Sequence, residues 1–285
     1  MSWANYHSHC TFCDGRSTME DFVKFAIAKG FRKYGFSSHA PLPFYTRWTM
    51  NAEDYPDYES EFYRLKRKYA GQIDLYLGLE VDYILNCTDA KRDFFTDKKF
   101  DYLIGSIHYL DKLSNGDFWS IDGGFREFDN GMTELFGGDI RKATKRFFEV
   151  STAMIEKGGF DIVGHVDKIT YHGQKYRDFD PTEKWFVDLE AELLQLVKEK
   201  GLMLEINTKS LREHGITYPH QNFYRMIKDM QIPVMVNSDC HYPTNVMESF
   251  EFTYKMLHAI GFRTMPQLFD DGWKPVEFDE YGLKF

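Results

Sequence analysis

The chain has 285 residues, of which 43% are hydrophobic, enough for one large globular domain or two smaller ones. The formal net charge is −9, and no segment is rich in lysine and arginine, which disfavours binding to nucleic-acid backbones. We expect no membrane span, because no apolar run reaches about 18 residues. We also expect no secretory signal at the N-terminus. Four cysteines in a chain this long favour a reducing compartment, so we predict a cytoplasmic location.

Apolar strand-like segments alternate with helix-like segments along the chain. Strands are predicted over residues 3–7, 34–38, 74–80, 101–107, 160–165, 202–207 and 233–238. The clearest helices are predicted over 18–30, 54–70, 139–157, 182–200 and 219–230. Ser17 or Thr18 can cap the first helix, and Gly158 and Gly201 stand where helices should end. This alternation predicts an α/β fold with a parallel sheet of about seven strands in a single domain over 1–285.

Two long segments interrupt this alternation. Residues 40–53 follow the second predicted strand, and residues 109–138, rich in glycine, aspartate and aromatic residues, follow the fourth. We predict that both are loops. Such loops either cover a ligand-binding edge or are plain surface excursions.

Side chains that bind metal ions recur where the predicted strands end. His7 and His9 close the first strand, and their spacing places both imidazoles on one face of a strand. Asp239 and His241 repeat that spacing at the last strand, which would neighbour the first in a closed barrel. The other ends carry His39, Glu80, His108 and His165. The carboxyl ends of parallel strands meet at one rim, where β/α barrels build active sites, so the pattern predicts a multi-metal hydrolase.

Some candidate residues have two interpretations. Glu80 follows an apolar run, where a carboxylate is costly unless it is ion-paired or bound to metal. Asp14 precedes a glycine, so it is either a ligand or part of an ordinary turn. Asp167 could orient a ligand from behind. Cys10 and Cys13 have the spacing of a redox pair or half a zinc site, but we favour packing because no second pair accompanies them.

With these residues assembled, the chain resembles the polymerase and histidinol phosphatase (PHP) superfamily. The resemblance rests on His7-Ser8-His9, His39, Glu80, His108, His165 and Asp239-Cys240-His241, in order along nearly the whole chain. The chain is most similar to the stand-alone histidinol-phosphate phosphatases, through Ser37-Ser38-His39-Ala40-Pro41-Leu42-Pro43-Phe44, Gly105-Ser106-Ile107-His108-Tyr109 and Gly164-His165-Val166-Asp167. The resemblance implies a distorted seven-stranded (β/α)7 barrel with a trinuclear metal centre.

The resemblance also implies a ligand set. It assigns one metal to His7, His9, Glu80 and Asp239, a second to Glu80, His108 and His165, and a third to Asp14, His39 and His241. These nitrogen and oxygen donors suit two to three zinc, iron or manganese ions, and the sequence does not choose among them.

The implied reaction is hydrolysis of histidinol phosphate by metal-activated hydroxide, as in histidine biosynthesis. Asp239 or His241 could assist the leaving alkoxide. Lys168 and Arg177 are candidates for holding phosphate charge, although each could equally be a solvated surface cation. Asp122 and Trp119 are candidates for meeting the ammonium and imidazole of the substrate.

Two alternatives remain from the sequence. One is a PHP-type enzyme of other specificity, such as a phosphotyrosine phosphatase or an exonuclease. The other is a non-catalytic metal-binding module. The expected partner is a small phosphorylated substrate rather than nucleic acid or a membrane, and nothing in the sequence indicates an oligomeric state.

Overall fold

The centre of the protein is a sheet of seven parallel strands. The structure is a computed structural model that describes residues 2–285. The strands follow one another in space in chain order, β1-β2-β3-β4-β7-β8-β9. They are β1 (Trp3–Asn5), β2 (Phe31–Phe36), β3 (Asp74–Asp82), β4 (Tyr102–Ser106), β7 (Ile162–Val163), β8 (Met203–Asn207) and β9 (Val234–Asn237). Each corresponds to a predicted strand, so the α/β fold with a parallel sheet is confirmed.

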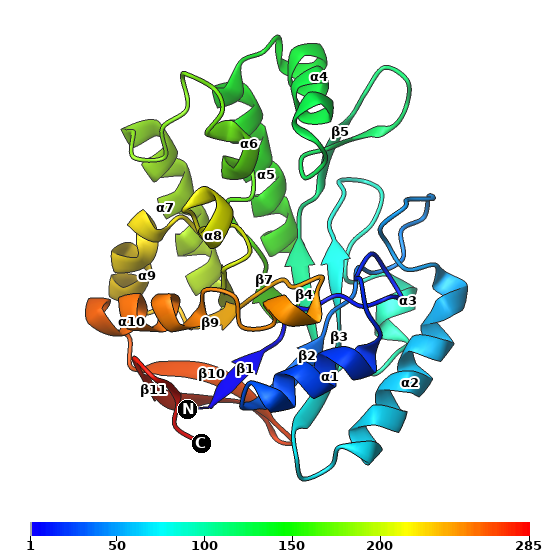
Figure 1. Cartoon of the computed structure of the whole chain (residues 1–285). Coiled ribbons are helices and arrows are strands. Elements are labelled where there is room, and N and C mark those ends of the chain that lie inside the picture. Colours follow the sequence, from blue (N-terminus) through cyan, green and yellow to red (C-terminus); the bar gives the residue numbers. More distant parts are fainter. Residues whose placement is uncertain (1) are drawn as a thin grey trace.

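The two margins of this sheet meet just beyond the ends of β1 and β9. Ser8 and Cys240 form a parallel bridge, and the backbone N–H of His9 donates to the carbonyl of Cys240 at 3.0 Å. This contact nearly closes the sheet into a barrel (Figure 1). The predicted distorted seven-stranded barrel is therefore confirmed.

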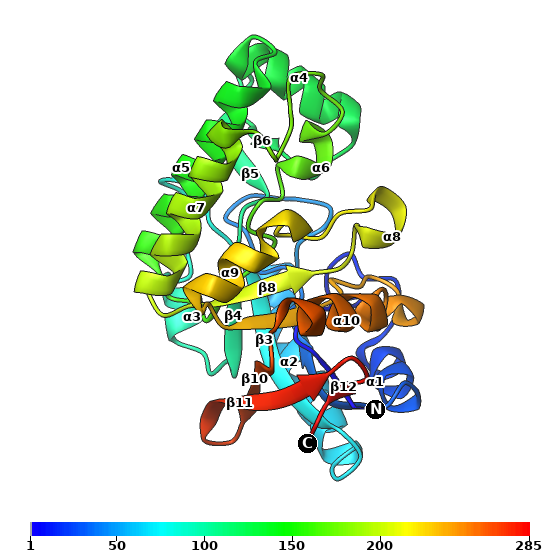
Figure 2. The ribbon, with the colours of Figure 1, turned by 90° about the vertical axis from the view of Figure 1, so that its left-hand side faces the viewer.

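Helices cover the outside of the barrel (Figures 1 and 2). The five predicted ones are α1 (Met19–Ala28), α2 (Tyr55–Lys68), α5 (Ile140–Lys157), α7 (Lys184–Glu199) and α9 (Tyr224–Met230). Thr18 caps α1, because its hydroxyl accepts the N–H of Asp21 while the Asp21 carboxylate accepts the N–H of Thr18. Gly158, with φ of 64°, ends α5 as predicted.

Shorter elements complete the connections. The sequence pattern did not predict α3 (Asp93–Thr96), α6 (Thr170–Gly173), α8 (Leu211–His214), α10 (Phe250–Ile260) or the 3-10 turns η1 (Ala52–Asp54), η2 (Gln221–Phe223) and η3 (Pro243–Asn245). None of the helices described has the length and apolar character needed to cross a lipid bilayer.

The predicted loop over 109–138 is wrong, because most of this segment is regular structure. It forms a hairpin of β5 (Tyr109–Lys112) and β6 (Phe118–Ser120), followed by α4 (Phe125–Phe136). Trp119 of β6 is buried against Phe128 and lies so close to Gly131 that any side chain there would collide with its indole ring. In contrast, residues 40–51 form no helix or extended strand, as predicted.

The C-terminal residues form a second sheet that the sequence pattern also did not predict. Its antiparallel strands are β10 (Thr264–Phe269), β11 (Gly272–Asp279) and β12 (Gly282–Leu283). Trp273 packs edge-on against Tyr6 and Tyr102 of the barrel, with ring centroids 5.1 and 6.3 Å away. In Figure 1 this sheet lies at one end of the barrel, while the β3 and β4 arrows point to the other, towards α4 and β5.

Candidate metal centre

Glu80 lies among five imidazoles where the strands end. Its carboxylate is only 1% exposed. Its oxygens lie within 3.6 Å of ring nitrogens from several strands. The distances are 3.2 Å to His7 Nε2, 3.6 Å to His9 Nε2, 2.9 Å to His39 Nδ1, 3.6 Å to His108 Nε2 and 2.8 Å to His165 Nε2. The structure thus brings these six residues together.

The backbone explains why these distant residues converge. His39 pairs with Glu80 in a parallel bridge just beyond β2, so the two residues are neighbours across the sheet. The Ser8–Cys240 bridge places His9 beside Asp239, with Nε2 and Oδ1 3.1 Å apart. Asp239 has φ of 47° and follows β9, so the chain turns there, close to the predicted end of the last strand at residue 238.

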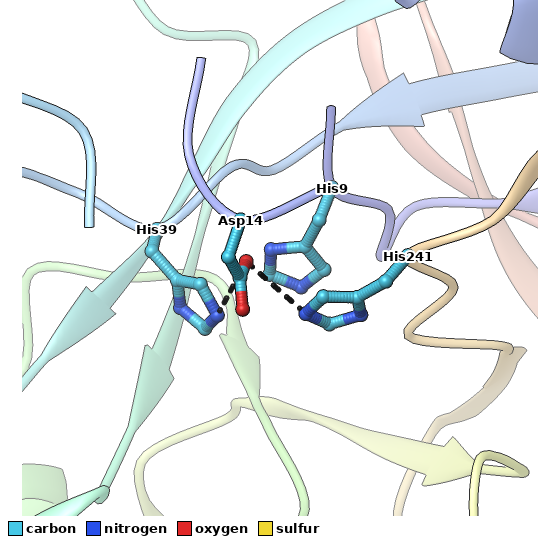
Figure 3. Close-up of side chains that lie close together, drawn as sticks. All are labelled: His9, Asp14, His39 and His241. Carbon is cyan, nitrogen blue, oxygen red and sulfur yellow. Dashed lines mark ion pairs between the residues drawn. The ribbon is translucent and has the colours of Figure 1, made fainter. Parts of the chain in front are cut away.

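A second group of ligand-type side chains shares His9 and His39 with the first and adds Asp14 and His241 (Figure 3). Asp14 Oδ1 is 3.2 Å from His241 Nε2 and 3.7 Å from His39 Nε2. The ring of His9 stacks on that of His241, with centroids 4.1 Å apart. All nine predicted ligands therefore belong to one continuous cluster.

The donor atoms of this cluster fit metal ions. In three groups they lie within 4.8 Å of one another: His7, His9 and Asp239; His39, Glu80 and His108; and His9, Asp14, His39 and His241. Five of the atoms are buried and make no hydrogen bond of suitable geometry among the described residues, although some lie at ion-pair distance from one another: His7 Nε2, His9 Nε2, Asp14 Oδ1, His39 Nδ1 and Glu80 Oε2. Buried polar atoms without partners are costly, so this set is suited to divalent cations.

The electrostatics of the cluster also favour cations. Burial opposes ionisation of Glu80, but the imidazoles of His7, His108 and His39 hold its pKa well below the usual range. Burial likewise lowers the pKa of His108, but Asp82 and Glu80 outweigh it and raise the pKa to about 9. The protein thus keeps the Glu80 carboxylate ionised and favours a proton on His108, whereas burial lowers the pKa values of His9 and His165. Metal ions would compete with the proton on His108, so binding should release protons.

Two buried carboxylates that the sequence analysis missed hold ligand rings in place. Glu205 of β8 has Oε1 2.6 Å from His7 Nδ1, and Asp82 of β3 has Oδ1 2.9 Å from His108 Nδ1. Such partners fix the orientation of an imidazole and leave its other nitrogen free for metal. Glu205 lies within an apolar strand. A carboxylate next to an apolar run is also the sequence pattern that identified Glu80.

Replacing Glu205 by glutamine is expected to weaken metal binding about 10- to 100-fold, because an amide orients His7 less strongly than a carboxylate. Metal titration of the chelated protein measures this affinity. Glu192→Gln removes an exposed carboxylate from α7 and serves as the control. Equal metal affinities in the two variants would argue against the role of Glu205.

Asp167 does not orient His165. Its Oδ2 accepts the backbone N–H of His220 at 2.8 Å, while the N–H of His165 donates to Glu205. Burial raises the pKa of Asp167 to about 7, and the negative charge of Asp167 adds to the burial that raises the pKa of Glu190 on α7. This carboxyl therefore lies behind the centre, next to another buried acid.

Cys10 and Cys13 are free thiols in the wall of the centre. The sulfur of Cys10 lies 3.3 Å from Ser38 Oγ, and that of Cys13 lies 3.6 Å from His9 Nδ1. Burial raises the pKa of Cys10 to about 11 and that of Cys13 further still. Both groups remain protonated, which agrees with the packing role favoured from the sequence.

A cavity of about 520 Å³ opens beside the cluster. Its lining includes Asp14, His39, His108 and His241 from the cluster, Tyr45, Thr46, Arg47 and Trp48 from the 40–53 loop, and Tyr109, Ser120, Asp122, Gly123, Glu127 and Lys209. A ligand in this cavity can therefore contact the metal ligands at one side and the 109–138 segment at the other.

The predicted substrate-binding residues do not all reach this cavity. Asp122 lines it and pairs with the buried Lys168, whose Nζ is 2.9 Å from Asp122 Oδ1. Arg177 is exposed and does not line it. Trp119 is 1% exposed and belongs to the core behind the hairpin. Lys209, missed from the sequence, lines the cavity with Nζ 3.1 Å from Asp239 Oδ1.

Comparison with known proteins identifies the family. The PHP domain family matches residues 5–209, more than half of the chain. The chain is 27% identical to a protein of Deinococcus radiodurans named "Probable histidinol-phosphatase", covering 91% of this chain and 94% of that one. It is 28% identical to the histidinol-phosphatase of Bacillus subtilis, covering 86% and 96%.

A solved structure shows the same fold. The histidinol phosphate phosphatase of Lactococcus lactis, in complex with zinc, L-histidinol and phosphate, superposes with a TM-score of 0.75. The alignment covers 100% of both chains at 18% identity. From the match over residues 5–209, in which most of the ligand cluster lies, we conclude that the chain belongs to the PHP domain family.

Proposed function

We propose that the protein is a metal-dependent phosphomonoesterase that hydrolyses L-histidinol phosphate to L-histidinol and phosphate. The observation that carries this proposal is the Glu80 carboxylate surrounded by five imidazoles, two of which, His39 and His108, line the neighbouring cavity. The names of the relatives support the choice of substrate. The zinc, histidinol and phosphate bound to the Lactococcus lactis enzyme agree with it.

We assign the ligands of up to three zinc, iron or manganese ions to the cluster. His7, His9, Glu80 and Asp239 would hold one ion, Glu80, His108 and His165 a second, and Asp14, His39 and His241 a third. His39 lies between the last two groups, with Nδ1 towards Glu80 and Nε2 towards Asp14. Such ions supply Lewis acidity and make hydroxide available near neutral pH.

We assign the binding of the phosphate charge to two lysines. Lys209 lines the cavity, and Lys168 lies behind it against Asp122. Burial opposes the charge of each lysine. The neighbouring carboxylates, Asp239 for Lys209 and Asp122 for Lys168, outweigh burial and raise both pKa values. Both groups therefore stay cationic, and we assign to Asp122 the positioning of Lys168 rather than direct contact with the substrate.

The leaving alkoxide needs a proton or a metal ion, and we assign this assistance to Asp239 or His241. Asp239 Oδ1 lies 3.7 Å from His241 Nδ1, so the two side chains would act at the same place. Asp239 lies beside Lys209, and His241 lines the cavity, so both are near the position proposed for the phosphate.

We further propose that residues 1–285 act as one catalytic unit, because Trp273 of β11 packs against the barrel residues Tyr6 and Tyr102. The four cysteines are free, which supports the predicted cytoplasmic location.

A substrate panel tests the proposed function. Phosphate release should be fastest from L-histidinol phosphate, with kcat/KM exceeding that for phosphotyrosine by at least about 100-fold, and single-stranded DNA should not be degraded. A preference for phosphotyrosine or DNA would contradict the proposed substrate. No turnover of any substrate by metal-loaded protein would favour the non-catalytic module.

A further inference from the structure

Glu127 is an exposed carboxylate that lines the cavity. It lies in the first turn of α4, and its carboxylate makes no ion pair or hydrogen bond within residues 2–285. The neighbouring acid of the cavity, Asp122, is neutralised by Lys168 at 2.9 Å. Asp14 faces His39 and His241. Glu127 is thus the acid of the cavity wall whose charge the described residues leave uncompensated.

The backbone around Glu127 turns its carboxylate back over the cavity. A Cβ atom on Gly123 would lie 2.5 Å from Glu127 Oε2, so the carboxylate occupies the space that a side chain at Gly123 would need. Gly123 itself lines the cavity, and its carbonyl accepts a hydrogen bond from the buried His172 at 2.8 Å. This contact holds the turn that precedes α4 and so places Glu127 at the wall.

Two stacked aromatic rings line the same cavity as Glu127. Trp48 stacks on Tyr109 with centroids 5.6 Å apart and donates its indole N–H to the Tyr109 hydroxyl at 3.1 Å. The Trp48 ring also lies 4.5 Å from His39 and 5.2 Å from His108. Burial raises the pKa of Tyr109 to about 12, and the charges of Asp82 and Glu127 add smaller contributions. Aromatic faces beside a carboxylate are the surroundings that bind organic ammonium groups.

The cavity wall therefore carries two kinds of group. Lys209 and the imidazoles suit a phosphate. Glu127, Trp48 and Tyr109 suit a cation. Arg47 also lines the cavity, but it forms no ion pair with Glu127.

We propose that Glu127 is a specificity-determining residue that binds the cationic amine end of a phosphomonoester, with Trp48 and Tyr109 as the wall beside it. This inference rests on the proposed function, because it assumes that the phosphate lies at the metal centre. The inference implies that the substrates are phosphomonoesters that carry an amino group. It assigns the amine to Glu127 in place of Asp122 and Trp119, the residues suggested by the sequence.

Two esters that differ in charge test the proposal. L-histidinol phosphate carries an ammonium group, and 3-phenylpropyl phosphate has a similar length without one. Glu127→Gln should lower kcat/KM for histidinol phosphate roughly tenfold, as expected for losing a contact between charged groups. It should leave kcat/KM for the phenylpropyl ester unchanged. Glu127→Lys should lower the first value further, and Glu156→Gln on α5 is the control because it removes an exposed carboxylate elsewhere.

Binding of L-histidinol, which has no phosphate, separates this inference from the proposed function. Calorimetry should show that wild-type protein binds L-histidinol and that Glu127→Gln binds it roughly tenfold more weakly. Equal binding by the two proteins, or equal losses of kcat/KM for both esters, would overturn the assignment of Glu127. Absence of phosphatase activity with an intact Glu127-dependent binding of histidinol would overturn the proposed function alone.

Discussion

Replacing Glu80 by glutamine is expected to lower kcat/KM for histidinol phosphate by at least about a thousandfold. The Glu80 carboxylate lies within 3.6 Å of five imidazole nitrogens, and one of its oxygens is buried without a hydrogen-bond partner among the described residues. A neutral amide keeps the shape of the side chain but offers one weaker oxygen and cannot bridge two cations. The measurement is phosphate release together with metal content per chain on the same sample.

The matched control is Glu53→Gln, which removes an exposed carboxylate from η1, at the end of the 40–53 segment. The control should retain both the metal content and the rate of the wild type. Circular dichroism should show that both variants are folded. A Glu80→Gln protein with wild-type metal content and a near-normal rate would remove Glu80 from the centre.

Removing bound metal with a chelator, followed by dialysis, is expected to abolish hydrolysis. Zinc, manganese or ferrous ions should restore it. The midpoint of thermal unfolding should also fall, because a ligand at 1,000 times its Kd stabilises the folded state by about 4 kcal/mol. Differential scanning calorimetry before and after reloading measures this change.

Glu80→Gln provides the comparison for this experiment, since its unfolding midpoint should respond much less to chelation. Full activity in a sample shown by elemental analysis to be free of metal would refute the proposed chemistry. The metal that restores activity at the lowest concentration would also decide among zinc, iron and manganese.

The barrel and its ligand cluster were predictable because they depend on few details. Strands that are buried on both faces are recognisable as short apolar runs, and their carboxyl ends share one rim whatever the helices outside do. The histidines and carboxylates at these strand ends therefore converge at that rim. Glu205 and Lys209 carry the same signal, within and just after β8, and could have been found in the same way.

The segment 109–138 shows where local patterns were insufficient. Its glycines and aspartates suggested a loop, but pairing of β5 with β6 and the approach of α4 decide which side chains are buried. Trp119 faces Phe128 and Gly131 because of these tertiary contacts. Arg177 was a candidate for holding phosphate but does not line the cavity, for a related reason. The short helix α6 separates it from the end of β7, so its distance from the site depended on an element that the sequence did not reveal.

The metal ligands stand on both sides of the seam where the barrel closes. His7 and His9 follow β1, Asp239 and His241 follow β9, and the backbone contact between these margins is the short bridge of Ser8 with Cys240. A cation held by His7 and Asp239, as we propose, would join the two margins of the sheet. Its binding energy would then be coupled to the pairing of the first strand with the last, so we expect loss of the ion to loosen the N-terminal strand before the rest of the barrel.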